Sequence, residues 1–139
     1  MNAKDCLKKY GKPKLEKNMV LWRVPNEYRF NNVIPPRIYL NKDLKNPLII
    51  AFELIFIRDL GHLIQSWDGC FNIRRSKGNK DEYSVHAWGV AVDINAKTNG
   101  YGKLPQMPLE LVSCFIEAGF DWGGLWKTYD GMHFQLRNI

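Results

Sequence analysis

The chain has 139 residues, of which 45% are hydrophobic and 24% are charged, and its formal net charge is +6. This composition is typical of a globular domain and excludes a disordered chain, and the length predicts one domain over residues 1–139. The longest apolar run, residues 48–57, is interrupted by Glu53 and is far shorter than the ~20 residues of a membrane-spanning helix, so we expect no membrane span.

In chain order, the sequence predicts a short helix over residues 5–10, strands over 19–24 and 37–40, a buried helix over 48–60, strands over 70–73 and 90–94, an amphipathic helix between 108 and 119, and a last strand over 132–137. The buried helix is expected to begin at Asn46-Pro47, because Asn caps helices and Pro is tolerated at the first helical position. These elements predict an α+β fold, with a small antiparallel sheet and helices packed on one side of it.

Positive charge is concentrated in the first third of the chain. Residues 1–45 hold eight Lys and three Arg against four acidic residues, a net charge of +7, and the remaining residues carry −1. Such a basic segment suits a polyanionic partner, namely nucleic acid, an anionic membrane or a cell wall with acidic polymers, although a charge run is more often only a solvated face. No nucleic-acid-binding motif accompanies it, so we expect no nucleic acid partner.

The segment SVHAWGVAVDIN, residues 84–95, places a histidine and an aspartate seven residues apart. A fully extended chain would separate His86 from Asp93 by roughly 23 Å. Two ligands of one zinc ion, in contrast, lie within ~3.5 Å of each other. Joint ligation therefore needs a chain reversal between them, and Gly89 tolerates the backbone angles of such a turn.

A third candidate ligand lies in TYDGMHFQL, residues 128–136, where His133 is on the polar face of the last predicted strand. His86, Asp93 and His133 together would form a His/Asp/His set that leaves a fourth zinc position open for water. Asp130, on a turn three residues before His133, could take the proton of that water. Each residue alone is more often structural, so the prediction rests on the set.

The order SxHxxGxAxD, followed by an acid-x-x-His near the C-terminus, resembles a family of zinc peptidases. The family contains D-alanyl-D-alanine carboxypeptidases and the L-alanyl-D-glutamate endopeptidases of phage endolysins, and the resemblance covers roughly residues 70–136. It implies a hedgehog/D,D-peptidase-like fold. It also implies one Zn²⁺ per chain, bound by His86, Asp93 and His133.

The resemblance further implies that Asp130 is the general base and that an arginine assists the substrate carbonyl. That arginine is Arg74 or Arg75, and the FNIRR context favours Arg74. Ser84 is equally consistent with support of the site and with an ordinary turn. Four aromatic residues are equally consistent with a substrate groove and with packing: Trp88, Trp122, Trp126 and Tyr129.

Many family members carry glutamate as the base, whereas this chain has Asp130, which is closer to the phage endopeptidases. The implied substrate is the stem peptide of bacterial peptidoglycan, and the implied reaction is hydrolysis of the L-Ala–D-Glu bond. A D-alanyl-D-alanine carboxypeptidase and a non-catalytic, zinc-stabilised binding domain are the alternatives.

The compartment is suggested by two features of the sequence. Three widely spaced cysteines without a CxxC pair, Cys6, Cys70 and Cys114, indicate free thiols in a reducing compartment. The basic N-terminus shows no apolar signal-peptide region. We therefore expect a protein made in a host cytoplasm without a signal peptide, which acts on the bacterial cell wall after release.

Overall fold

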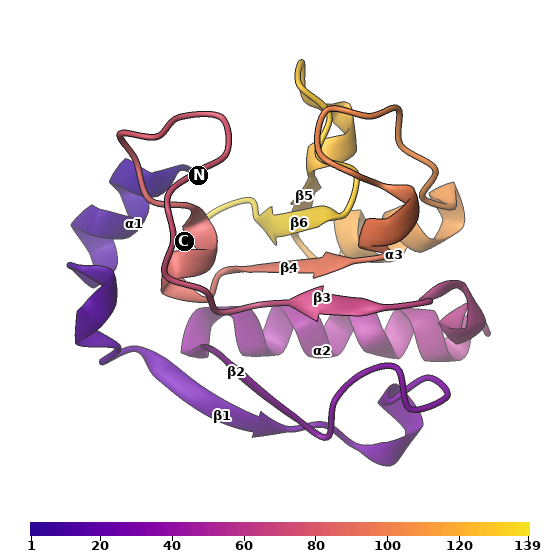
Figure 1. Ribbon diagram of the computed structural model, residues 1–139. Coiled ribbons are helices and arrows are strands. Elements are labelled where there is room, and N and C mark those ends of the chain that lie inside the picture. The colour runs from indigo at the N-terminus through magenta and orange to yellow at the C-terminus, as the bar shows by residue number, and fades with distance from the viewer.

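The computed structural model describes all residues, 1–139, as an α+β fold, which confirms the predicted class (Figure 1). The α-helices are α1 (Ala3–Tyr10), α2 (Lys42–Ile57) and α3 (Leu109–Glu117). Strands β1 (Met19–Arg23) and β2 (Arg37–Asn41) form a two-stranded antiparallel sheet. A four-stranded antiparallel sheet, in the order β3-β4-β6-β5, contains β3 (Trp67–Gly69), β4 (Ala91–Ile94), β5 (Phe120–Trp122) and β6 (His133–Leu136). No helix is both long and apolar enough to cross a membrane.

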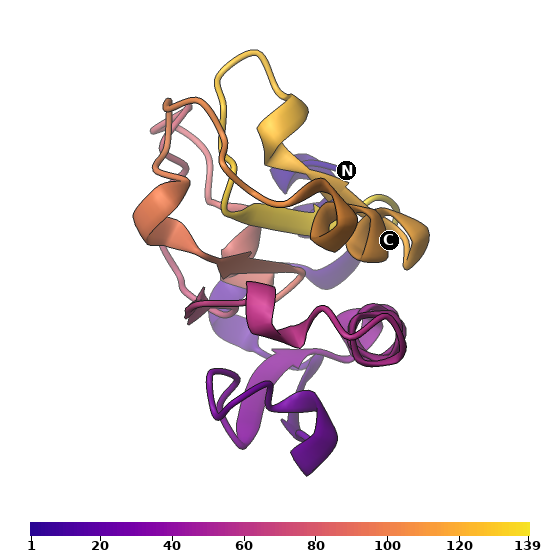
Figure 2. The same cartoon turned by 90° about the vertical axis from the view of Figure 1, so that its right-hand side faces the viewer.

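The two central strands, β4 and β6, separate the core from the face that carries the candidate site. Phe134 of β6 is fully buried and stacks on Phe115 of α3, with ring centroids 4.2 Å apart. Helices α2 and α3 lie on the same side of the four-stranded sheet (Figure 2). Because neighbouring residues of a strand point to opposite faces, Asp93 and His133 project from the other face. These two residues are direct cross-strand partners.

Two predicted elements have different bounds in the structure, and one strand was not predicted. Helix α2 begins five residues before Pro47, because Asn41 caps it by accepting a hydrogen bond from the backbone N–H of Asp43 (2.9 Å). The strand predicted over 70–73 is instead β3, which ends at Gly69, where φ is +130° and the chain leaves the sheet. The sequence analysis did not predict β5, because its three residues are too few to show a clear alternation.

The predicted chain reversal at Gly89 is present. Gly89 ends the 3₁₀ turn Val85–Trp88 with φ +67°, and its carbonyl oxygen accepts a hydrogen bond from the backbone N–H of Asn41 (3.0 Å). A Cβ at this position would lie 2.9 Å from the Asn41 nitrogen and 2.6 Å from Cε of Met19. The position therefore needs glycine both for its backbone angle and for its close contact with the neighbouring sheet.

We expect Gly89→Ala to lower the free energy of unfolding by about 3 kcal/mol, since a positive φ costs roughly 1–2 kcal/mol and the steric conflict costs about as much again. Gly102→Ala is the matched control, because Gly102 has φ +79° but a Cβ added there would meet no heavy atom within 4 Å. It should lose only about 1 kcal/mol in the same denaturant titration. Equal losses in the two variants would contradict the close contact at Gly89.

Candidate metal centre

Three elements bring together the three side chains that the sequence predicted as metal ligands. His86 lies on the 3₁₀ turn Val85–Trp88, Asp93 on β4 and His133 on β6. Nε2 of His86, Nδ1 of His133 and Oδ1 of Asp93 form a triangle in which each pair of atoms is 3.1 Å apart. Both histidines are buried, with exposed fractions of 2% and 5%.

The outward-facing nitrogen of each imidazole is held by an acceptor. Nδ1 of His86 lies 2.7 Å from the carbonyl oxygen of Cys70, which can only accept, so Nδ1 carries the proton. Nε2 of His133 lies 2.9 Å from Oε1 of Gln135. The Gln135 amide is oriented in turn, because its Nε2 donates to the carbonyl oxygen of Met1 (2.9 Å). Both imidazoles therefore direct an unprotonated nitrogen towards Asp93.

Three lone-pair-bearing atoms at this separation fit a small cation. The ligands of a tetrahedral zinc ion, bound at about 2.0–2.1 Å, lie about 3.3 Å from one another, close to the observed triangle. The electrostatics agree, since burial alone would raise the pKa of Asp93 but the two imidazoles hold that pKa well below its ordinary value. Likewise, burial would lower the pKa of His133, but the Asp93 carboxylate raises it. Positive charge is thus strongly favoured at the centre of the triangle.

Asp130 lies beside this group and has an oxygen without a partner. Its Oδ1 is buried and accepts no hydrogen bond. Burial raises the pKa of the Asp130 carboxyl, nearby His133 opposes the rise, and the like charge of Asp93 adds to it. Its backbone is fixed, because the N–H donates to Gly123 O (2.9 Å) and the carbonyl accepts from His133 N–H (3.1 Å). A fixed carboxylate with a free oxygen and a raised pKa suits a general base.

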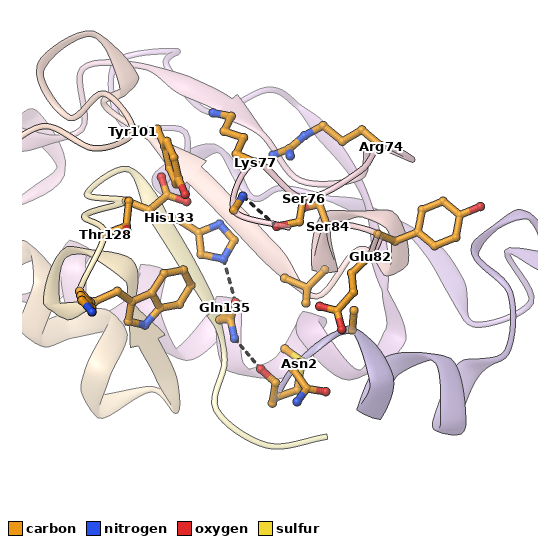
Figure 3. Close-up of a pocket in the computed structure, with 18 residues that line it drawn as sticks. Asn2, Arg74, Ser76, Lys77, Glu82, Ser84, Tyr101, Thr128, His133 and Gln135 are labelled. Atoms are coloured by element: carbon orange, nitrogen blue, oxygen red, sulfur yellow. Dashed lines mark hydrogen bonds between the residues drawn. The ribbon is translucent and has the colours of Figure 1, made fainter. Parts of the chain in front are cut away.

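Two cavities border members of the metal-ligand triad, which we define as His86, Asp93 and His133. The larger cavity, of about 460 Å³, is bordered by His133 and Asp130 and is drawn in Figure 3. The smaller cavity, of about 340 Å³, is bordered by His86 and Asp93. The two cavities share Arg74 and Lys77 and offer room for a substrate next to the triad.

The two arginines that the sequence left as alternatives occupy different environments. Arg74 borders both cavities, as does Lys77. The guanidinium of Arg75 instead lies over the ring of Tyr83, 4.2 Å from its centroid. Of the two arginines, Arg74 is therefore the one that borders the cavities beside the triad, and Lys77 is an additional cation there.

The remaining candidates divide into supporting and substrate-facing residues. Trp88 and Trp122 are buried and donate their indole N–H to the backbone oxygens of Gly11 and Gly131, so they are structural. Trp126 is 38% exposed and borders the larger cavity. Ser84 accepts a hydrogen bond from the N–H of His86 (3.3 Å) and so fixes the ligand-bearing turn.

Sequence reasoning missed the role of Gln135, although one signal was present. The residue lies two positions after His133, on the same face of the same strand. A polar residue so placed is a direct neighbour of a ligand, but its side-chain contact with Met1 joins the two ends of the chain and has no local pattern.

Three converging metal-ligating side chains with an adjacent carboxylate, bordered by two cavities, are typical of metal-dependent hydrolases. Residues 77–136 match the family model described as D-alanyl-D-alanine carboxypeptidase, a stretch that contains the triad and Asp130 and begins just after Arg74. The match agrees with the family that the motifs resemble, and it supports a metallopeptidase that acts on peptidoglycan. No curated protein and no solved structure matches the chain.

We expect Gln135→Ala to weaken metal binding by roughly 10- to 100-fold, because it removes the acceptor that fixes the tautomer of His133. Competition with a chromophoric chelator measures the affinity. Gln65→Ala, at an exposed glutamine away from the triad, is the control and should bind metal like the parent protein. Unchanged affinity in Gln135→Ala would show that the contact does not position His133.

Proposed function

We propose that the protein is a zinc-dependent endopeptidase that hydrolyses the L-Ala–D-Glu bond of the peptidoglycan stem peptide, in the manner of a phage endolysin. The observation that carries the proposal is the triad of 3.1 Å separations next to the unpartnered oxygen of Asp130. His86, Asp93 and His133 would hold one Zn²⁺. When bound, zinc supplies a Lewis acid that lowers the pKa of water towards ~7 and polarises the scissile carbonyl.

Two residues of this chain would then carry out proton transfer and charge stabilisation, Asp130 and Arg74. Asp130 takes the proton of the attacking water and returns it to the departing amine. Its raised pKa makes the charged form a stronger base than an exposed aspartate. Arg74 lies within reach of both cavities, where its guanidinium can stabilise negative charge as it develops on the carbonyl oxygen.

Two features favour an endopeptidase over a carboxypeptidase. Different members of the triad border two cavities, so a peptide has room for residues beyond those at the scissile bond. The base is an aspartate, as in the phage endopeptidases that the motifs resemble. The family description favours the second candidate, a D-alanyl-D-alanine carboxypeptidase. An oriented base next to the triad argues against a purely structural zinc domain.

The surface charge of the first third supports a further part of the proposal, attachment to anionic cell-wall polymers. Of the eleven basic residues within 1–45, Lys9 alone forms an ion pair, with Asp43 (3.1 Å). We also propose that the protein reaches the wall after release from the cytoplasm in which it is made, as the resemblance to endolysins implies.

The bond cleaved can be identified by mass spectrometry of products from purified cell walls. We expect a new N-terminus at D-Glu, loss of activity with a zinc chelator, and recovery when zinc is added back. Release of free D-alanine alone would replace the endopeptidase by the carboxypeptidase. Activity that survives complete metal removal would contradict both.

Asp130→Asn should keep its metal and lose turnover by at least about 100-fold, because the amide cannot accept the proton. Since the pKa of Asp130 is raised in the fold, its charged form costs stability above the ordinary pKa of an aspartate, and this cost is lost as the pH falls through the raised pKa. The variant lacks that cost, so its melting temperature at neutral pH should not fall. Asp81→Asn, in an exposed loop, is the control for charge removal.

A variant that is active despite the substitution would remove Asp130 from catalysis. A variant that is inactive but also unstable or metal-free would assign Asp130 a structural role instead. For the parent protein, the same account predicts that turnover declines on the acidic side as Asp130 becomes protonated.

A further inference from the structure

Trp126 is the aromatic residue closest to the chemistry that the mechanism leaves unused. Its ring centroid lies 5.4 Å from that of His133, with the two ring planes inclined by 52°. The residue is 38% exposed, although a tryptophan that only packs is usually buried, and it borders the larger cavity. Part of the indole is thus open to a ligand beside His133.

The walls of the larger cavity have the chemistry of a sugar site. Tyr101 also borders the cavity and is 36% exposed, and Nζ of Lys77 lies 5.7 Å from its ring centroid (Figure 3). Short polar side chains supply hydrogen-bonding groups around the aromatic residues: Asn2, Ser76, Ser84 and Thr128. Such a combination suits a ring with one apolar face and several hydroxyl groups. The smaller cavity has no Trp, Tyr or Phe in its wall.

The structure of peptidoglycan specifies how far a sugar lies from the scissile bond. The stem peptide begins with L-Ala, which is joined to the glycan through a lactyl group. Only these two units separate the sugar from the L-Ala–D-Glu bond, about 7 Å of extended chain. Four residues and the lactyl group separate it from the D-Ala–D-Ala bond, about 18 Å. For a substrate bound in an extended conformation, a sugar can therefore reach an aromatic ring beside the triad only when the first bond is cleaved.

We propose that Trp126 is a specificity residue that stacks on the glycan sugar carrying the stem peptide, with the larger cavity holding the sugar and L-Ala and the smaller cavity holding D-Glu and the residues after it. This inference rests on the proposed function, since it assumes cleavage at L-Ala–D-Glu. The inference specifies how the substrate is oriented: its glycan end lies in the cavity that His133 and Asp130 border.

The test compares two substrates that share the scissile bond. One is a muramyl peptide, in which the sugar is attached, and the other is the same stem peptide with an N-acetyl group in place of the sugar and lactyl group. We expect Trp126→Ala to lower kcat/KM about tenfold on the muramyl peptide, mainly through KM, and by less than about twofold on the acetyl peptide. Trp126→Phe, which keeps an aromatic face, should recover most of the loss.

Tyr129→Ala is the matched control, because Tyr129 lies on the same loop and is 37% exposed but does not border the larger cavity. It should leave both substrates unaffected. Metal content and melting temperature are measured for every variant. An equal loss on both substrates, or a loss of bound metal, would mean that Trp126 only supports His133 and would overturn the proposal.

An unchanged rate of Trp126→Ala on the muramyl peptide would also overturn it. If the parent protein cleaves at D-Ala–D-Ala instead, the proposed function fails and this inference fails with it. If it cleaves at L-Ala–D-Glu without any preference for the sugar-bearing substrate, the proposed function stands and the role of Trp126 is wrong.

Discussion

The candidate site is built on three hydrogen-bond acceptors that lie 3.1 Å from one another: Nε2 of His86, Nδ1 of His133 and Oδ1 of Asp93. When both imidazoles are neutral, none of these three atoms carries a proton. Such an arrangement is repulsive by itself, because two imidazole lone pairs and a carboxylate meet in a buried volume. It becomes favourable when positive charge occupies the centre. Protonation of His133 supplies part of this positive charge, and the raised pKa of His133 agrees with that. A divalent cation, in contrast, binds all three acceptor atoms at once. The fold therefore favours a bound metal ion.

Much of the fold serves to keep these atoms in place. The antiparallel register of β4 and β6 makes Asp93 and His133 cross-strand partners, so the backbone sets their separation. Backbone carbonyl groups of the N-terminal residues 1–11 accept hydrogen bonds from residues that hold the two imidazoles in place. Trp88, on the turn that carries His86, donates to Gly11 O (2.7 Å), and Gln135, which orients His133, donates to Met1 O. Residues far from the catalytic motifs thus contribute directly to the geometry of the site, even though the family match begins only at residue 77.

The sequence predicted the class of fold and the members of the triad because both depend on local patterns. Alternation of apolar and polar residues over 132–137 predicted β6. The glycine between His86 and Asp93 predicted the chain reversal that the structure contains. The start of α2 was wrong because two helix-start signals compete there, and the cap at Asn41 prevails over Pro47. The FNIRR context favoured Arg74, but the acceptor at Gln135 and the exposed indole of Trp126 could not be derived, since each depends on contacts between segments distant in the chain.

The most direct test is the protonation pattern of the imidazoles in the zinc-loaded protein, measured by long-range ¹H–¹⁵N NMR correlation. With three histidines in the chain, assignment is simple, and the exposed His62 is an internal reference for an unbound ring. We predict one zinc ion per chain, with His86 protonated at Nδ1 and metal-bound at Nε2, and His133 protonated at Nε2 and metal-bound at Nδ1. Failure to bind zinc, or the opposite pattern in either ring, would contradict the account.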